Sequence, residues 1–196
     1  DSLQSRISRR MQHAPCPQRL AFEKALALGR KRQRQPGSLS PGERLQDGLL
    51  DRTVRRKVRE RFGGRIKAIM AGGAALDPEV GEFFTALGVP VLQGYGQTEA
   101  APAVSCNPPD RPKLDTVGPP LAGVTARVAA DGELLVRGPM VMQGYWGLPE
   151  HTAATLQDGW LYTGDIAEID SDGYIRITDR KQDIVVLEVS SFQLDH

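Results

Sequence analysis

The spacing of apolar residues in the first third of the chain predicts two helices. The helical patterns cover about residues 18–34 and 44–62, and in the second of them Leu45, Leu49, Val54 and Val58 recur near helical spacing. Residues 36–42 lie between them and are rich in proline and glycine, which predicts a loop.

Residues 66–92 change to a strand, helix, strand pattern. A short apolar strand at 66–70 ends in a Gly-Gly turn, and the next strand covers 89–92. Between them Asp77 can cap a helix whose first turn Pro78 fixes. This order predicts a parallel crossover, and ligands of such sheets bind beyond the carboxyl ends of the strands.

From about residue 120 the pattern becomes antiparallel. Strands are predicted at 126–129 and 134–137 around one Asp-Gly turn, and at 166–169 and 174–178 around another. We therefore predict an α/β fold in which a parallel βαβ portion packs against a small antiparallel barrel or sandwich. The expected divisions are residues 1–119 (helical arm and βαβ portion), 120–186 (β-rich subdomain up to a hinge) and 187–196 (an atypical tail).

The net charge of +1 conceals a segregation of sign along the chain. Residues 1–70 contain 18 Lys or Arg against 6 Asp or Glu, whereas the remainder is acidic. An anionic membrane surface, coenzyme phosphates or nucleic acid could explain the basic half. We favour solvated helix faces beside acidic neighbours, because no aromatic residues interleave the charges and no nucleic-acid motif accompanies them.

The chain has neither a leader nor an apolar run long enough for a membrane span, and it begins with Asp1, so we expect a piece of a longer cytoplasmic protein. Its two cysteines, Cys16 and Cys106, show no metal-binding or paired spacing, which favours reduced thiols.

Three short polar strings carry the candidate chemistry. They are Gly94-Tyr95-Gly96-Gln97-Thr98-Glu99, then Trp160-Leu161-Tyr162-Thr163-Gly164-Asp165, then Thr178-Asp179-Arg180-Lys181. Each alone has a purely structural explanation, as a helix start or an Asp–Arg ion pair. Together they supply an aromatic face, hydroxyl and carboxylate groups and a fixed cation, which predicts an ATP site.

Within that site, each residue type suits one part of the nucleotide. The Tyr95 ring can stack on a purine between Gly94 and Gly96, and Thr98 can bind a phosphate oxygen. Glu99 offers a hard oxygen ligand to Mg²⁺. Asp165 can accept hydrogen bonds from both ribose hydroxyls, and Arg180 can donate to sugar and phosphate oxygens. Upstream, Gly73 and Ala74 leave main chain open at a strand end, although a tight turn without a ligand explains Gly-Gly equally well.

Over about residues 60–186 the chain resembles the adenylate-forming superfamily of acyl-CoA synthetases, adenylation domains and luciferases. The first 60 residues, with Leu20 to Arg30, and the string Arg59 to Gly64 look like its long-chain fatty acyl-CoA synthetase branch. The resemblance implies ATP and Mg²⁺ as cofactors, with fatty acid and coenzyme A as substrates. It implies that Gly73 and Ala74 border the acyl pocket, Gly94 and Tyr95 the adenine, Thr98 the phosphates, and Asp165 and Arg180 the ribose. Glu99 would hold the magnesium.

Two further strings resemble the family and are interpreted as scaffold. They are Gly132-Glu133-Leu134-Leu135-Val136-Arg137-Gly138-Pro139 and Gly144-Tyr145-Trp146. At the hinge position, where the family usually has Asp or Lys, this sequence has Gln182. The tail at 187–196 faintly resembles a segment of the Mur ligases.

The family's phosphate loop and its lid lysine do not occur in this sequence, so we expect no acyl-adenylate formation by the 196-residue chain alone; fatty-acid-dependent ATP–pyrophosphate exchange would contradict this. A fatty acyl-AMP ligase that acts with a carrier protein is an alternative. A non-catalytic remnant that binds nucleotide or protein is another. Peripheral membrane contact is compatible with the resemblance, and the oligomeric state is open.

Overall fold

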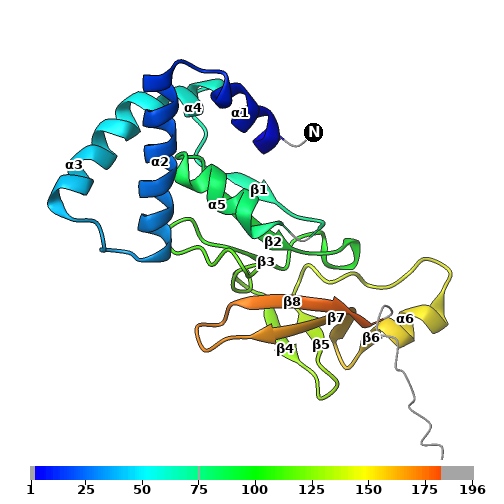
Figure 1. The fold of residues 1–196 in the computed structure, drawn as a ribbon. Helices are drawn as coiled ribbons and strands as arrows, with labels where there is room; N and C mark the ends of the chain where they lie inside the picture. The colour runs from blue at the N-terminus through cyan, green and yellow to red at the C-terminus, as the bar shows by residue number, and fades with distance from the viewer. Residues whose placement is uncertain (1–2, 75, 182–196) are drawn as a thin grey trace, which may run out of the picture.

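A layer of helices forms one end of the molecule and an antiparallel sheet the other (Figure 1). The computed structural model describes residues 3–74 and 76–181. The helical layer contains α1 (Leu3–Gln12), α2 (Cys16–Arg34), α3 (Pro41–Leu50), a π-helical turn η1 (Asp51–Arg55) and α4 (Arg56–Arg61). The helix predicted at 18–34 is α2, and the helix predicted at 44–62 is the helical run of α3, η1 and α4. Helix α1 was not predicted.

Local sequence explains where the helices begin. Ser40 and Glu43 form a reciprocal capping box at the start of α3, each side chain bonding the other residue's backbone N–H. The Asp77 carboxylate accepts from the Glu79 N–H at the start of α5 (Pro78–Ala86), as its sequence predicts. Phe22, Phe83 and Phe84 then join α2 to α5 in one buried cluster.

The parallel crossover is confirmed. Strands β1 (Ile69–Ala71) and β2 (Val91–Tyr95) pair in parallel on either side of α5, with Ile69 opposite Val91. Both strands begin later than predicted, and β2 extends to Tyr95. A short strand β3 (Ser105–Cys106) then pairs antiparallel with β2.

The predicted antiparallel subdomain is also confirmed, and both Asp-Gly hairpins are present. Its strands are β4 (Thr125–Val128), β5 (Glu133–Arg137), β6 (Leu156–Gln157), β7 (Trp160–Ile169) and β8 (Ile175–Arg180). They form one five-stranded sheet in the order β4-β5-β7-β6, with β8 paired to β7. Helix α6 (Pro149–Thr155) and strand β6 were not predicted.

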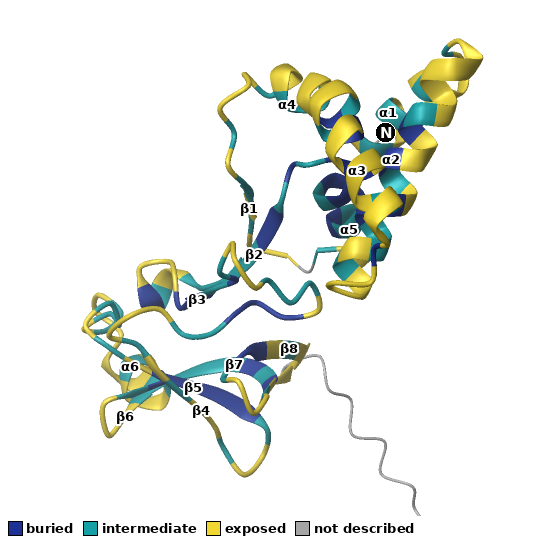
Figure 2. Cartoon of the chain, turned by 90° about the vertical axis from the view of Figure 1, so that its left-hand side faces the viewer, coloured by how far each residue is buried: buried dark blue, intermediate teal, exposed yellow. Residues whose placement is uncertain are grey.

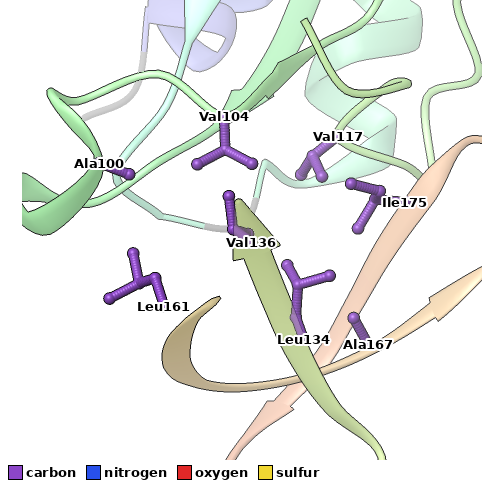
Figure 3. Close-up of a cluster of buried hydrophobic side chains, with 8 residues drawn as sticks. All are labelled: Ala100, Val104, Val117, Leu134, Val136, Leu161, Ala167 and Ile175. Carbon is purple, nitrogen blue, oxygen red and sulfur yellow. The ribbon is translucent and has the colours of Figure 1, made fainter. Parts of the chain in front are cut away.

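A buried cluster joins the antiparallel sheet to the loops that follow β2 (Figure 2). In Figure 3, Val104 and Val117 approach from one side, and Leu134 and Val136 of β5 lie opposite them, with Ile175 alongside. The subdomain therefore packs against the parallel part of the fold, as predicted.

A buried arginine ties the helical layer to α5. Arg55, in the π-helical turn, is fully buried and donates to the Asp47 carboxylate over 2.6 Å. It also donates to the backbone carbonyls of Ala86 and Ala25. Each of these acceptors is buried, so the Arg55 guanidinium links α2, α3 and α5 by hydrogen bonds inside the protein.

Much of the basic charge of the helical layer is paired with nearby carboxylates. Arg30 and Arg34 both lie against Glu82 of α5, and Lys31 pairs with Glu43 of α3. These contacts support solvated helix faces beside acidic neighbours. No helix among residues 3–74 and 76–181 has the length and apolar character that a bilayer crossing needs.

Candidate functional site

A cavity of about 890 Å³ opens at the carboxyl ends of β1 and β2 and faces β8. Seven predicted binding residues line it together, namely Gly73, Ala74, Gly94, Tyr95, Gly96, Asp165 and Arg180. They come from the turn after β1, from β2 and from the β7–β8 hairpin, so segments up to about 100 residues apart in sequence converge. We call this the first cavity.

Backbone packing requires glycine at position 96 and leaves little room for a side chain at Gly94. A Cβ at Gly96 would lie 1.5 Å from the Pro102 carbonyl oxygen, and one at Gly94 would lie 3.0 Å from the Ser105 carbonyl oxygen. The loop after β2 therefore folds tightly onto the strand end. Gly73 differs, because its φ of +82° demands glycine while the space beside it is open.

Tyr95, Asp165 and Arg180 form one polar contact network in the first cavity. The Tyr95 hydroxyl donates to Asp165 Oδ2 over 2.5 Å, and Arg180 Nε lies 3.4 Å from Asp165 Oδ1. The Asp165 residue is only 6% exposed, whereas the Arg180 side chain is 74% exposed. The Asp–Arg ion pair considered in the sequence is present, and it lies inside the cavity.

Burial and the neighbouring carboxylate hold the Tyr95 phenol in its neutral form. Desolvation is the main cause of the raised pKa of Tyr95, and the hydrogen bond to Asp165 raises it further. The phenol thus acts as a fixed donor to the carboxylate. It leaves the Asp165 Oδ1 atom directed toward Arg180.

A second cavity of about 500 Å³ lies beside the first and contains Glu99. Glu99 Oε1 accepts a hydrogen bond from the Tyr145 hydroxyl over 2.8 Å. That contact raises the pKa of the Tyr145 phenol. Gln97 lines both cavities, so the two share a wall.

Thr98 is exposed at the start of a short 3₁₀ turn, η2 (Thr98–Ala100), and lines neither cavity. It therefore has the helix-start position that the structural interpretation gave it. Its neighbour Glu99 points toward the second cavity. The two residues are adjacent in sequence but differ in surroundings.

The donor set at Glu99 fits a magnesium ion held mainly by substrate. Among residues 3–74 and 76–181 no group of three or more His, Cys, Asp or Glu side chains could hold a metal ion. Mg²⁺ commonly takes one or two carboxylates and completes its shell with phosphate oxygens and water. The second cavity has two carboxylates in its lining, Glu99 and Glu133, and this number is compatible with that requirement.

Several residues that line the two cavities were not predicted as site residues, and Glu133 and Tyr145 are two of them. Glu133 accepts from the Gly164 N–H, and Tyr145 donates to Glu99, although both belong to strings interpreted as scaffold. A carboxylate at an otherwise buried strand position was the available signal for Glu133. The predicted hinge residue Gln182 and the tail at 187–196 lie outside the described residues.

The comparisons with known proteins give a consistent family. The family model described as "AMP-binding enzyme" matches residues 21–146. A long-chain-fatty-acid–CoA ligase of Mycobacterium bovis is 41% identical over 143 residues, which are 73% of this chain and 24% of that protein. The chain thus spans about a quarter of the length of this curated relative.

Solved structures agree with the sequence relatives. Apo MatB from Rhodopseudomonas palustris superposes with a TM-score of 0.59 at 35% identity, covering 65% of this chain and 28% of that one. The O-succinylbenzoate coenzyme A synthetase MenE of Bacillus subtilis, in complex with ATP and a magnesium ion, gives 0.59 at 30% identity, covering 63% and 28%. Both resemblances involve the mixed α/β arrangement described above.

Proposed function

Because the chain belongs to the AMP-binding enzyme family, we propose that it is part of an ATP-dependent, AMP-forming long-chain fatty acid–CoA ligase. The observation that supports this most directly is the first cavity, where five residues predicted to contact nucleotide lie together with Gly73 and Ala74, which are predicted to border the acyl group. The similarity to a fatty-acid–CoA ligase supports the substrate class.

In the proposed reaction a fatty carboxylate oxygen attacks the α-phosphorus of ATP, and the bond to pyrophosphate breaks. The thiol of coenzyme A then attacks the acyl carbonyl, and AMP leaves. The described residues bind and orient the adenosine for both steps. Rigid placement of the reacting atoms is a large source of rate enhancement in such reactions.

The lining of the two cavities supports the residue roles that we propose. Asp165 accepts hydrogen bonds from the ribose hydroxyls, and Arg180 donates to oxygens on the same nucleotide. The Tyr95 ring borders the adenine between Gly94 and Gly96, while Gly73 and Ala74 border the acyl group.

On the phosphate side, we assign Glu99 to a Mg²⁺ ion, which disperses developing phosphate charge when bound. We assign Thr98 to a phosphate oxygen. Thr98 is exposed at the start of η2, between Gln97 and Glu99, which both line the second cavity.

We further propose a cytoplasmic enzyme with a division near residue 119 and a hinge at Gln182. Where the enzyme contacts a membrane, the basic helical layer faces the anionic surface. The exposed cations of α4 support this orientation, since basic side chains near an anionic leaflet are attracted to it.

Binding of a long-chain acyl-sulfamoyl adenosine, measured by isothermal titration calorimetry, tests the nucleotide assignment. Asp165→Asn and Tyr95→Ala should each weaken binding by roughly tenfold or more, because a charge-assisted hydrogen bond or a stacking face is lost. Asp158→Asn is the matched control, since Asp158 is exposed and lines neither cavity. Unchanged affinity in both site variants would remove the assignment.

A further inference from the structure

Glu133 is a buried carboxylate that joins two parts of the first cavity without lining it. It is 3% exposed and stands at the start of β5, where the pairing with β7 is irregular. Its Oε1 accepts from the Gly164 N–H over 2.8 Å, and its Oε2 pairs with Lys181 Nζ over 2.8 Å. Each oxygen therefore holds a different segment.

The first of these segments is the turn that presents Asp165. Gly164 has a φ of +74°, and the Thr163 hydroxyl donates to the Leu134 carbonyl over 2.7 Å. The same hydroxyl accepts from the Asp165 N–H over 3.2 Å. The hydrogen bond from the Gly164 N–H to Glu133 fixes the Thr163–Gly164 peptide, which directly precedes Asp165. It therefore sets the direction in which the Asp165 carboxylate enters the first cavity.

The second segment is the end of β8. Lys181 follows Arg180 directly, and its ammonium lies between Glu133 and the exposed Asp131, 2.7 Å from the latter. These two carboxylates raise the pKa of Lys181, Asp131 contributing most. The backbone that presents Arg180 is thereby tied to the β4–β5 hairpin.

We propose that Glu133 is a positioning residue of the nucleotide site. It holds the Gly164 peptide and Lys181 at once, so that the Asp165 carboxylate and the Arg180 guanidinium converge on the diol of a ribose. The inference rests on the proposed function, because it needs a nucleoside in the first cavity. It goes further in assigning a specificity for the sugar hydroxyls to Glu133, which lines the second cavity and not the first.

The test compares two probes, a long-chain acyl-sulfamoyl adenosine and its 2′,3′-dideoxy counterpart, by calorimetry on the full chain. The wild type should prefer the ribose probe by about tenfold, which corresponds to a charge-assisted hydrogen bond. General damage to the cavity lowers both affinities and leaves their ratio unchanged. Misplacement of Asp165 lowers the ratio.

Three substitutions separate the effect of the length of the Glu133 side chain from the effect of its charge. Glu133→Gln keeps an acceptor within reach of Gly164 and should retain the preference for the ribose probe. Glu133→Asp keeps the charge but is one methylene too short, so it should bring the ratio of the two affinities to within about threefold of unity. Asp131→Asn is the matched control. It removes the other carboxylate that pairs with Lys181 and leaves the hydrogen bond between Gly164 and Glu133 in place, so its affinity ratio for the two probes should equal that of the wild type. Circular dichroism confirms the fold of each variant.

The outcomes distinguish this inference from the proposed function. A wild type that binds neither probe, or binds both equally, would overturn the proposed function and the inference with it. A wild type with the expected preference, which Glu133→Asp also shows, would overturn the inference alone. Loss of the preference in Glu133→Gln but not in Glu133→Asp would likewise overturn it, because it would trace the preference to the negative charge that pairs with Lys181 and not to the hydrogen bond with the Gly164 N–H.

Discussion

Replacement of Tyr95 by phenylalanine removes one hydroxyl from the first cavity and keeps the ring. The lost group donates to Asp165 Oδ2 over 2.5 Å, and the Asp165 residue is 6% exposed. A hydrogen bond to a charged acceptor contributes about 1.5–3 kcal/mol to stability, and Arg180 remains near the other carboxylate oxygen. We therefore expect Tyr95→Phe to lower the free energy of unfolding by about 1.5–2 kcal/mol at pH 7.5.

The same bond predicts a pH dependence with a definite sign. The pKa of Tyr95 is raised in the folded chain by burial and by Asp165, whereas an unfolded tyrosine titrates near about pH 10. The folded state thus retains a proton that the unfolded state releases, so this contribution is complete below about pH 10 and is lost as the pH rises above it. By pH 11 the wild type should lose about 1.4 kcal/mol that the phenylalanine variant does not lose.

Urea unfolding followed by far-UV circular dichroism at pH 7.5 and pH 11 measures both effects. The stability gap between wild type and Tyr95→Phe should nearly close at the higher pH. Tyr162→Phe serves as control, because Tyr162 lines the second cavity and its hydroxyl has no hydrogen-bond partner among residues 3–74 and 76–181. A gap of equal size at both pH values would refute the argument that burial and the hydrogen bond to Asp165 keep the phenol neutral.

Three further predictions concern the second cavity, the helical layer and the loop after β2. Tyr145→Phe should raise the Mg²⁺ concentration at half-saturation of ATP binding by about tenfold, because Glu99 loses the donor that orients it; an unchanged titration would contradict this. Arg55→Met should lower the free energy of unfolding by about 3–5 kcal/mol, since it removes the buried cation from Asp47, which keeps only Arg32, and the donor to the Ala25 and Ala86 carbonyls, whereas the exposed Arg56→Met should change it little in the same urea titration. Gly96→Ala should prevent native folding, because its Cβ would overlap a backbone oxygen; a native circular dichroism spectrum would disprove it.

Local signals in the sequence were sufficient to predict the helices and strands that position the site. The Asp77 cap and the two Asp-Gly turns act through neighbouring residues, so their effects can be predicted without the fold. Tyr95, Asp165 and Arg180 of the first cavity were predictable because each carries a chemical group suited to one part of a nucleotide. Whether those groups bind nucleotide stays a prediction.

The contacts that support the site could not be predicted in this way. Glu133 meets Gly164 only because β5 pairs with β7, and Tyr145 reaches Glu99 across 46 residues. Both depend on strand register and loop path, which the local pattern does not determine. The short strand β6 and helix α1 were missed for a related reason, since packing against neighbours stabilises them more than their own sequence does.

Gln97 stands in the wall that separates the two cavities, and this has a consequence for how ligand fragments should behave. A molecule that spans both compartments places its second half at a high effective concentration once the first half is seated. Adenosine and pyrophosphate offered as separate pieces should therefore bind far more weakly than the intact molecule, by more than the affinities of the two halves would suggest. Fragment screening against this chain would favour linked compounds over single-site binders.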